Sequence, residues 1–195
     1  RSLYQLSPQG CGNPVDAKMR LVKATEVDSP RLIKYYQDSS LSGHVLLKLL
    51  KKGSFFSQYK IQSDDFVTYM LVDDDQQESI QAIVSLVFRK AWIKGREQVV
   101  GYATDLRVSP QRKVILTWSH HLLPTLQAER QQRDCKYIFS VVAEVQSQAY
   151  NAFIRPRSLR RELPRYYLFR KFDIVSVHGR LPFAPSPLAT INTRF

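Results

Sequence analysis

The stretch that decides the fold runs from Gln98 to Val142. It opens with an apolar, β-rich segment, Gln98–Val108 (QVVGYATDLRV), and is broken by the basic loop Ser109–Lys113 (SPQRK). Val114–Arg133 then carries apolar residues at helical spacing, and Lys136–Val142 (KYIFSVV) again has the composition of a strand. A strand that enters a helix through a basic loop favours anions, because the first N–H groups of the helix lack partners and its dipole is positive there. The stretch therefore predicts a strand–helix–strand unit with a phosphate site.

Up to the helix of this unit, the sequence predicts a first strand, two helices and then three antiparallel strands. The first strand is expected over Lys18–Thr25. The three antiparallel strands are expected over Phe66–Val72, Ser79–Ile93 and Glu97–Val108, the last two joined through a turn at Lys94-Gly95-Arg96. One helix is expected to start at Asp28-Ser29-Pro30, and a second is expected over Ser42–Lys52. After the unit, Ser147–Ile154 is expected to be helical and Tyr167–Val177 to end as a strand.

This order of elements predicts an α/β fold, a central mixed β-sheet flanked by helices. Residues 1–17 are expected to be a flexible lead-in, residues 18–178 the folded domain, and residues 179–195 a Pro-containing C-terminal segment.

The composition limits the choice of partners and compartment. The chain has 195 residues, 29 Lys and Arg against 17 Asp and Glu, and a formal charge of +12, which suits an anionic partner. There are two cysteines, Cys11 and Cys135, too few for a disulfide framework. No run approaches the roughly 18 apolar residues of a membrane span, and residues 1–17 lack the pattern of a secretory signal. We expect a cytoplasmic protein, with Cys135 buried as a small apolar side chain.

Three features resemble the GNAT superfamily of N-acyltransferases over about residues 18–177. Leu106-Arg107-Val108-Ser109-Pro110 is similar to the strand end before the family's cofactor loop, and Lys136–Val142 to its next parallel strand. The third, Leu168-Phe169-Arg170-Lys171-Phe172-Asp173-Ile174-Val175, is similar to its "L-Y-x-K-x-G-F-x-x-V" ending, with Phe169 in the Tyr place and no Gly. The resemblance implies a GNAT-like fold and transfer of an acyl group from acetyl-CoA or a longer acyl-CoA to an amine on a small molecule or protein.

The resemblance also implies where the cofactor binds. The backbone of Leu106, Arg107 and Val108 would bind the pantetheine arm and the thioester carbonyl, with the Val108 N–H as oxyanion donor. The family's pyrophosphate loop is Gln/Arg-x-x-Gly-x-Gly/Ala, but here Gln111 is followed by Arg112, Lys113 and then Val114, and neither Gly is present. We expect Arg112 and Lys113 to hold the pyrophosphate as cations; the alternative is a loop that lost its cofactor and kept the fold.

Acyl transfer to an amine needs a base, an oxyanion donor and an acid. Asp105, expected to share a strand face with Ala103 and Arg107, and Glu144 are the candidate bases. Tyr150 is the candidate acid, with Tyr167 as its alternative. Each also has a structural explanation, as an ion-paired surface carboxylate or a packed aromatic ring.

The remaining motifs have mainly structural explanations. Asp73-Asp74-Asp75 is expected to form a turn and not a metal site, and the pair His120-His121 lacks a third ligand nearby. Pro124 should kink or restart the helix in which it lies. The aromatic residues that could line an acyl pocket or simply pack in the core are Trp118, Phe139, Phe153, Phe169 and Phe172.

Two other functions remain open. One is a GNAT-related synthase that takes long acyl chains from an acidic acyl carrier protein, which the basic charge would suit. The other is a non-catalytic GNAT-shaped module that binds nucleic acid or a protein partner through the basic run Arg155–Lys171, where Tyr166, Tyr167 and Phe169 could stack on bases. No named nucleic-acid motif is present.

Overall fold

The computed structural model describes residues 19–39, 53–76, 78–142, 167 and 170–171. The chain falls into two units, Arg1–Arg165 and Tyr166–Phe195. The second unit is described only at Tyr167, Arg170 and Lys171, and all three residues are exposed. All the helices and strands of the described residues belong to the first unit.

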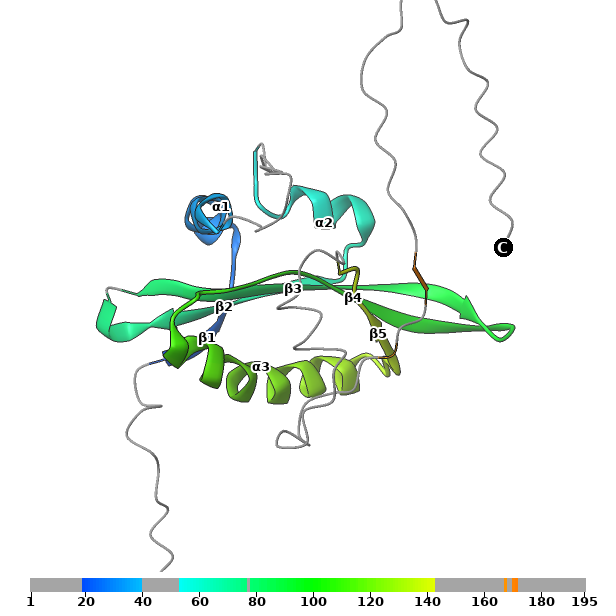
Figure 1. The fold of residues 1–195 in the computed structure, drawn as a ribbon. Helices are drawn as coiled ribbons and strands as arrows, with labels where there is room; N and C mark the ends of the chain where they lie inside the picture. Colours follow the sequence, from blue (N-terminus) through cyan, green and yellow to red (C-terminus); the bar gives the residue numbers. More distant parts are fainter. Residues whose placement is uncertain (1–18, 40–52, 77, 143–166, 168–169, 172–195) are drawn as a thin grey trace, which may run out of the picture. The chain divides into compact units, whose positions relative to one another are not determined.

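The first unit is built on a five-stranded mixed sheet, in the order β1-β2-β3-β4-β5 (Figure 1). The first four strands pair antiparallel, and β5 pairs parallel with β4. The strands are β1 Met19–Lys23, β2 Phe66–Asp73, β3 Ser79–Ile93, β4 Arg96–Val108 and β5 Tyr137–Phe139. The mixed α/β sheet expected from the sequence is thus confirmed.

Helices cover both faces of this sheet. α1 (Ser29–Asp38) and α2 (Ser57–Gln62) lie on one face, and α3 (Arg112–Gln132) lies on the other (Figure 1). Short 3₁₀ turns, η1 (Glu26–Asp28) and η2 (Asp74–Gln76), precede α1 and follow β2. Among the described residues, no helix combines the length and the apolar character that crossing a bilayer requires.

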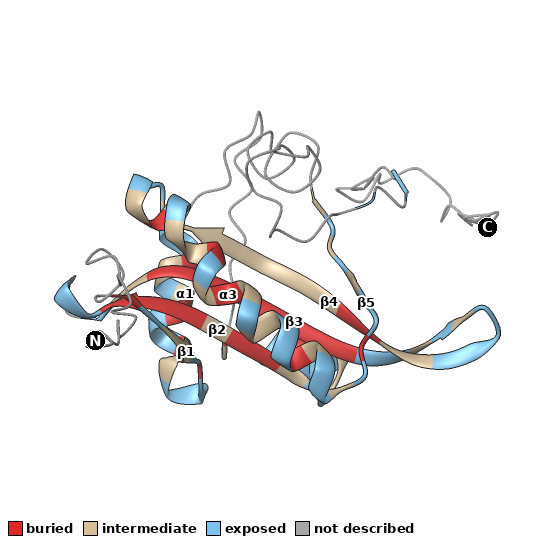
Figure 2. Cartoon of the chain, turned by 90° about the horizontal axis from the view of Figure 1, so that it is seen from below, coloured by how far each residue is buried: buried red, intermediate tan, exposed pale blue. Residues whose placement is uncertain are grey.

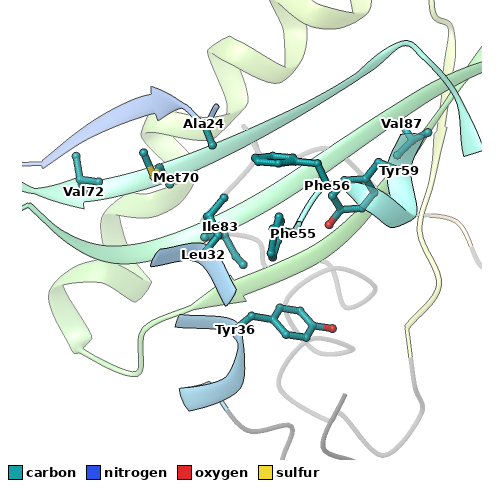
Figure 3. Packing of buried hydrophobic residues seen from close by; sticks show 10 residues of the cluster. All are labelled: Ala24, Leu32, Tyr36, Phe55, Phe56, Tyr59, Met70, Val72, Ile83 and Val87. Atoms are coloured by element: carbon teal, nitrogen blue, oxygen red, sulfur yellow. The ribbon is translucent and has the colours of Figure 1, made fainter. Parts of the chain in front are cut away.

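An aromatic core fills the space between the sheet and the helices α1 and α2. Phe55 and Tyr59 are fully buried there, with their ring centroids 5.9 Å apart in an edge-on contact. The buried members of this cluster are Ala24, Leu32, Tyr36, Phe55, Phe56, Tyr59, Met70, Val72, Ile83 and Val87 (Figure 3). These aromatic rings attach α2 to the sheet, although α2 has fewer than two helical turns and could not be stable alone.

The opposite face of the sheet packs against α3. Val114 at the start of the helix joins Met19, Leu71 and Ala82, and a second cluster near the helix end contains Phe88 and Cys135. β2 and β3 are accordingly buried for most of their length, whereas β4 is mostly half-buried (Figure 2). Cys135 is buried, as the sequence predicted, and burial raises the pKa of its thiol.

Three local predictions need correction. α2 was not expected, and the strand expected over Lys136–Val142 is paired only from Tyr137 to Phe139. α3 also continues through Pro124 and does not restart there. Pro124 removes the hydrogen bond to the carbonyl of His120, but both residues are exposed, so water can satisfy that carbonyl. The expected helices Ser42–Lys52 and Ser147–Ile154 lie outside the described residues.

Candidate functional site

The pairing between the parallel strands β4 and β5 ends partway along β4, which continues beyond the end of β5. β5 pairs with β4 only at Val100, Gly101 and Tyr102. Tyr102 stacks on Phe139 at this last pair, with a centroid distance of 4.9 Å. β4 then runs on to Val108 while, in the part of the chain that the structure describes, no strand pairs with its outer edge. Backbone groups of this edge are therefore placed to bind an extended ligand.

β4 contains a bulge at the beginning of this unpaired segment. Ile83 lies opposite Arg107 and Ser85 opposite Thr104, so β4 has one more residue than β3 between these pairs. Asp105, within the bulge, has a φ of 54°, in the left-handed region that Asp tolerates better than most residues.

The bulge corrects the prediction that Ala103, Asp105 and Arg107 share a face. Ala103 packs into the cluster on the α3 side, whereas Asp105 and Arg107 contact residues of α2 and α1. The extra residue shifts the alternation of side chains, which reverses the face of Asp105 relative to Ala103.

Asp105 is held by two side chains of α2. The amide Nε2 of Gln58 donates to its Oδ2 at 2.7 Å, and the hydroxyl of Tyr59 donates to the same oxygen. Burial, followed by the negative charge of Asp105, raises the pKa of Tyr59 far above its ordinary value. Tyr59 therefore remains protonated and acts as a fixed hydrogen-bond donor. The sequence did not reveal these two partners, because α2 itself shows no clear helical pattern.

The side chain of Arg107 anchors the end of α1. Its guanidinium lies over the ring of Tyr36, 4.5 Å from the centroid, and its Nη1 donates to the carbonyl of Ser39 at 3.3 Å. The predicted cofactor role of Arg107 concerns its backbone, but Arg107 lies opposite Ile83 in the register, and its N–H and carbonyl point toward β3 and not toward the open edge.

The backbone N–H of Val108 points toward that open edge. The N–H of the next residue, Ser109, donates across to the carbonyl of Gln81 on β3 at 2.8 Å. Since N–H groups alternate in direction along a strand, the N–H of Val108 points away from β3. The side chains of Val108 and Leu106 lie on the α3 face.

The basic loop leads directly into α3, whose first helical residue is Arg112. Arg112 is exposed, while the Nζ of Lys113 lies 3.9 Å from a carboxylate oxygen of the buried Asp73. Val114 occupies the position of the first Gly in the family's pyrophosphate loop, but its side chain is fully buried against the sheet and is not directed at the loop. At the second Gly place, Leu116 is 45% exposed. Arg112 is thus the better placed of the two predicted phosphate-binding cations.

Several other candidates lie apart from this site or outside the described residues. Glu144 and Tyr150 belong to the part of the chain that is not described, and Tyr167 is 85% exposed. His120 is exposed, and no described residue forms a hydrogen bond with the buried Nε2 of His121. Within the described residues, no group of three His, Cys, Asp or Glu side chains could hold a metal ion.

The expected turn at Asp73-Asp74-Asp75 is confirmed. Asp73 ends β2, and its carboxylate accepts the N–H of Asp75 at 3.1 Å. Asp74 pairs with Arg20 at 2.7 Å.

Comparisons with known proteins agree with this geometry at the level of the fold. No protein-family model and no curated protein matches the sequence. An aminoglycoside acetyltransferase from an uncultured soil metagenomic sample superposes with a TM-score of 0.55 at 15% identity, covering 81% of this chain and 99% of its own. A protein of Clostridium acetobutylicum, described as a predicted acetyltransferase and solved with acetyl-CoA, gives 0.51 at 16% identity, covering 75% and 96%. An acetyltransferase of Trypanosoma brucei gives 0.52 at 14% identity, covering 80% and 99%. The described part of this chain therefore has the fold of the GNAT N-acetyltransferases, as the sequence resemblance implied.

Proposed function

We propose that the protein is an acyl-CoA-dependent N-acyltransferase that moves an acyl group from a CoA thioester to an amine. The observation that carries the proposal is the separation of β4 from β5 beyond Tyr102, with the basic start of α3 directly after β4. This arrangement offers an open strand edge to an extended pantetheine arm and a cationic helix N-terminus to a pyrophosphate. The similar protein of Clostridium acetobutylicum was solved with acetyl-CoA, which supports the choice of donor.

In this proposal the donor lies along the segment Leu106–Val108, held by those backbone groups that point to the open edge, among them the N–H of Val108, and by the cation of Arg112. Lys113 adds positive charge nearby, although its ammonium is close to Asp73. The N–H of Val108 points to the open edge and donates to the thioester oxygen as it gains negative charge.

The reaction itself is a direct displacement. The nitrogen of the acceptor amine attacks the thioester carbonyl carbon, its proton passes to the carboxylate of Asp105, and the C–S bond breaks. The CoA thiolate leaves and takes a proton, for which Tyr150 remains the proposed donor. Tyr59 and Gln58 act as positioning residues, because they fix the carboxylate of Asp105 from α2. Glu144 remains the alternative base.

A second donor is favoured by one observation. Leu116, near the start of α3, is exposed at the position of the family's second small residue, and its neighbour Ile115 is exposed as well, so two bulky side chains lie where a pyrophosphate would bind. An acyl carrier protein presents the same pantetheine arm without that pyrophosphate, and its acidic surface would suit a chain of charge +12.

The test combines binding with turnover. Thermal-shift measurements with CoA, acetyl-CoA and longer acyl-CoAs should show stabilisation that grows with concentration. Release of the CoA thiol is then followed with a panel of amines. With an accepted amine, Asp105→Asn should lower kcat by about 10²- to 10⁴-fold and leave CoA affinity unchanged. Lys34→Gln, an exposed change on α1, serves as control.

The outcomes separate the possibilities. Stabilisation by acyl-CoA with turnover supports the proposal. Turnover with acyl carrier protein alone supports the second donor. Binding of CoA without turnover for any amine points to a non-catalytic module, and no binding of any CoA species at millimolar concentration contradicts the proposal.

A further inference from the structure

The strands β3 and β4 extend beyond the rest of the sheet as a two-stranded hairpin. β2 last pairs with β3 at Val87, and β5 first pairs with β4 at Val100. From Arg89 to Val99 the two strands pair with each other, and we call this segment the basic hairpin. It projects past the ends of β2 and β5 (Figure 1), and its outer part is exposed (Figure 2).

Cations dominate the basic hairpin. Its sequence contains Arg89, Lys90, Lys94 and Arg96 against a single acid, Glu97. Glu97 pairs with Lys90 at 2.8 Å. The tip therefore presents Lys94 and Arg96 on either side of Gly95, and an anionic partner would complement it.

The turn contains Lys94 at a position where the backbone conformation favours Asn. Lys94 and Gly95 have φ values of 51° and 73°, as in the tight hairpin turns that prefer Asn-Gly. A Lys with positive φ costs about 1–2 kcal/mol relative to its normal conformation. The chain carries a charge at this position although Asn would fit the turn better.

An aromatic ring, that of Trp92, lies near the tip, two residues before Lys94; Arg96 is paired with Ile93 and lies on the other face of the hairpin. Trp92 is 75% exposed, directly opposite Glu97 in the register. A largely exposed Trp has a flat face available for stacking, and stacking on a nucleobase stabilises a complex by about 1–3 kcal/mol per base. Cations that bind phosphates next to a ring that stacks on bases are the combination found in proteins that bind single strands.

We propose that the basic hairpin binds single-stranded nucleic acid, with Lys94 and Arg96 on phosphates and Trp92 stacked on a base. This surface differs from the basic run at Arg155–Lys171 and does not depend on the acyltransferase proposal. An anionic membrane is the less favoured partner, because the tip is charged and would lose its hydration if Trp92 entered the lipid.

The experiment measures binding of labelled oligo(U) and oligo(dT) to the full chain by fluorescence anisotropy over a range of salt concentrations. Lys94→Asn combined with Arg96→Gln should weaken binding at least tenfold. It should also reduce the slope of log K against log salt by about 1.4, since each phosphate contact on a single strand contributes about 0.7. Lys94→Asn also suits the turn, so a loss of binding would not come from a damaged hairpin.

Two further variants test the ring and the role of total charge. Trp92→Ala should weaken binding about fivefold or more, and Trp92→Tyr should retain most of it. Lys23→Gln combined with Lys34→Gln removes the same charge from exposed positions elsewhere and should change binding less than twofold.

Three results would overturn the proposal. Equal losses in the hairpin and control variants would mean that binding follows net charge alone. Binding of anionic phospholipid vesicles but not of oligonucleotides would identify a lipid surface. Absence of binding to both at low salt would leave the hairpin without this role.

Discussion

Replacing Tyr59 with Phe tests the contact on which the candidate site is built. Tyr59 is fully buried, and its ring packs edge-on against Phe55 at 5.9 Å and in a tilted contact with Phe66 at 5.7 Å. Phe keeps both ring contacts, so the variant removes only the hydroxyl that donates to Asp105. A hydrogen bond to a charged group contributes about 1.5–3 kcal/mol. Because Asp105 is half-buried and keeps the bond from Gln58, we expect the lower part of this range.

The loss is measured by urea denaturation and by thermal unfolding. A decrease of about 1.5–2 kcal/mol in the free energy of unfolding corresponds to about 3–8 °C in Tm for a domain of this size. In a protein that already carries Asp105→Asn, Tyr59→Phe should lower the free energy of unfolding by about 1 kcal/mol less, because the acceptor is then neutral. Asn tolerates the positive φ of this position. Equal costs in both backgrounds, within about 0.5 kcal/mol, would refute the Tyr59–Asp105 contact.

Three further predictions concern the cofactor loop, the strand junction and alkaline stability. Arg112→Gln should weaken CoA binding about 10- to 100-fold, as expected for the loss of a charge-assisted hydrogen bond. The control Lys23→Gln should leave CoA affinity unchanged. If a calorimetric titration gives the same affinity for Arg112→Gln as for the unchanged protein, the phosphates bind elsewhere. Gly101→Ala should destabilise the fold by about 1–3 kcal/mol in urea, because a Cβ there would lie 3.0 Å from Cγ1 of Ile138; a more stable variant would show that β5 is not packed as described. Burial raises the pKa of Tyr35 from 10 to about 12. The unfolded chain therefore loses this proton at a lower pH than the folded chain, and the free energy of unfolding falls as the pH rises from 10 to about 12. Tyr35→Phe should make this fall less steep, and unfolding curves that show the same fall in both proteins would contradict the prediction.

The pattern of side chains was sufficient to predict the first four strands of the sheet. The alternation of apolar residues gave the bounds of β3, Ser79–Ile93, and the turn at Lys94-Gly95, as the structure has them. The strand–loop–helix order placed α3 after β4, because a long amphipathic segment and a Pro-containing break are strong local features.

The site depends on features that the sequence does not reveal. The β4 bulge adds one residue without a Gly to mark it, so a strictly alternating strand placed Asp105 on the same face as Ala103. α2 is short and polar, and it is held by Phe55 and Tyr59 against the sheet and not by its own propensity. The partners of Asp105 could therefore not be predicted without the tertiary structure.

The most direct measurement is amide hydrogen exchange of the protein with and without saturating acetyl-CoA. We expect the amide of Val108 and its neighbours on the open edge of β4 to become strongly protected when the cofactor binds. The basic hairpin, Arg89–Val99, should exchange at an unchanged rate and serves as the internal control. If acetyl-CoA binds while the amides from Asp105 to Val108 exchange as before, the cofactor lies elsewhere and the proposed acyl-transfer site is wrong.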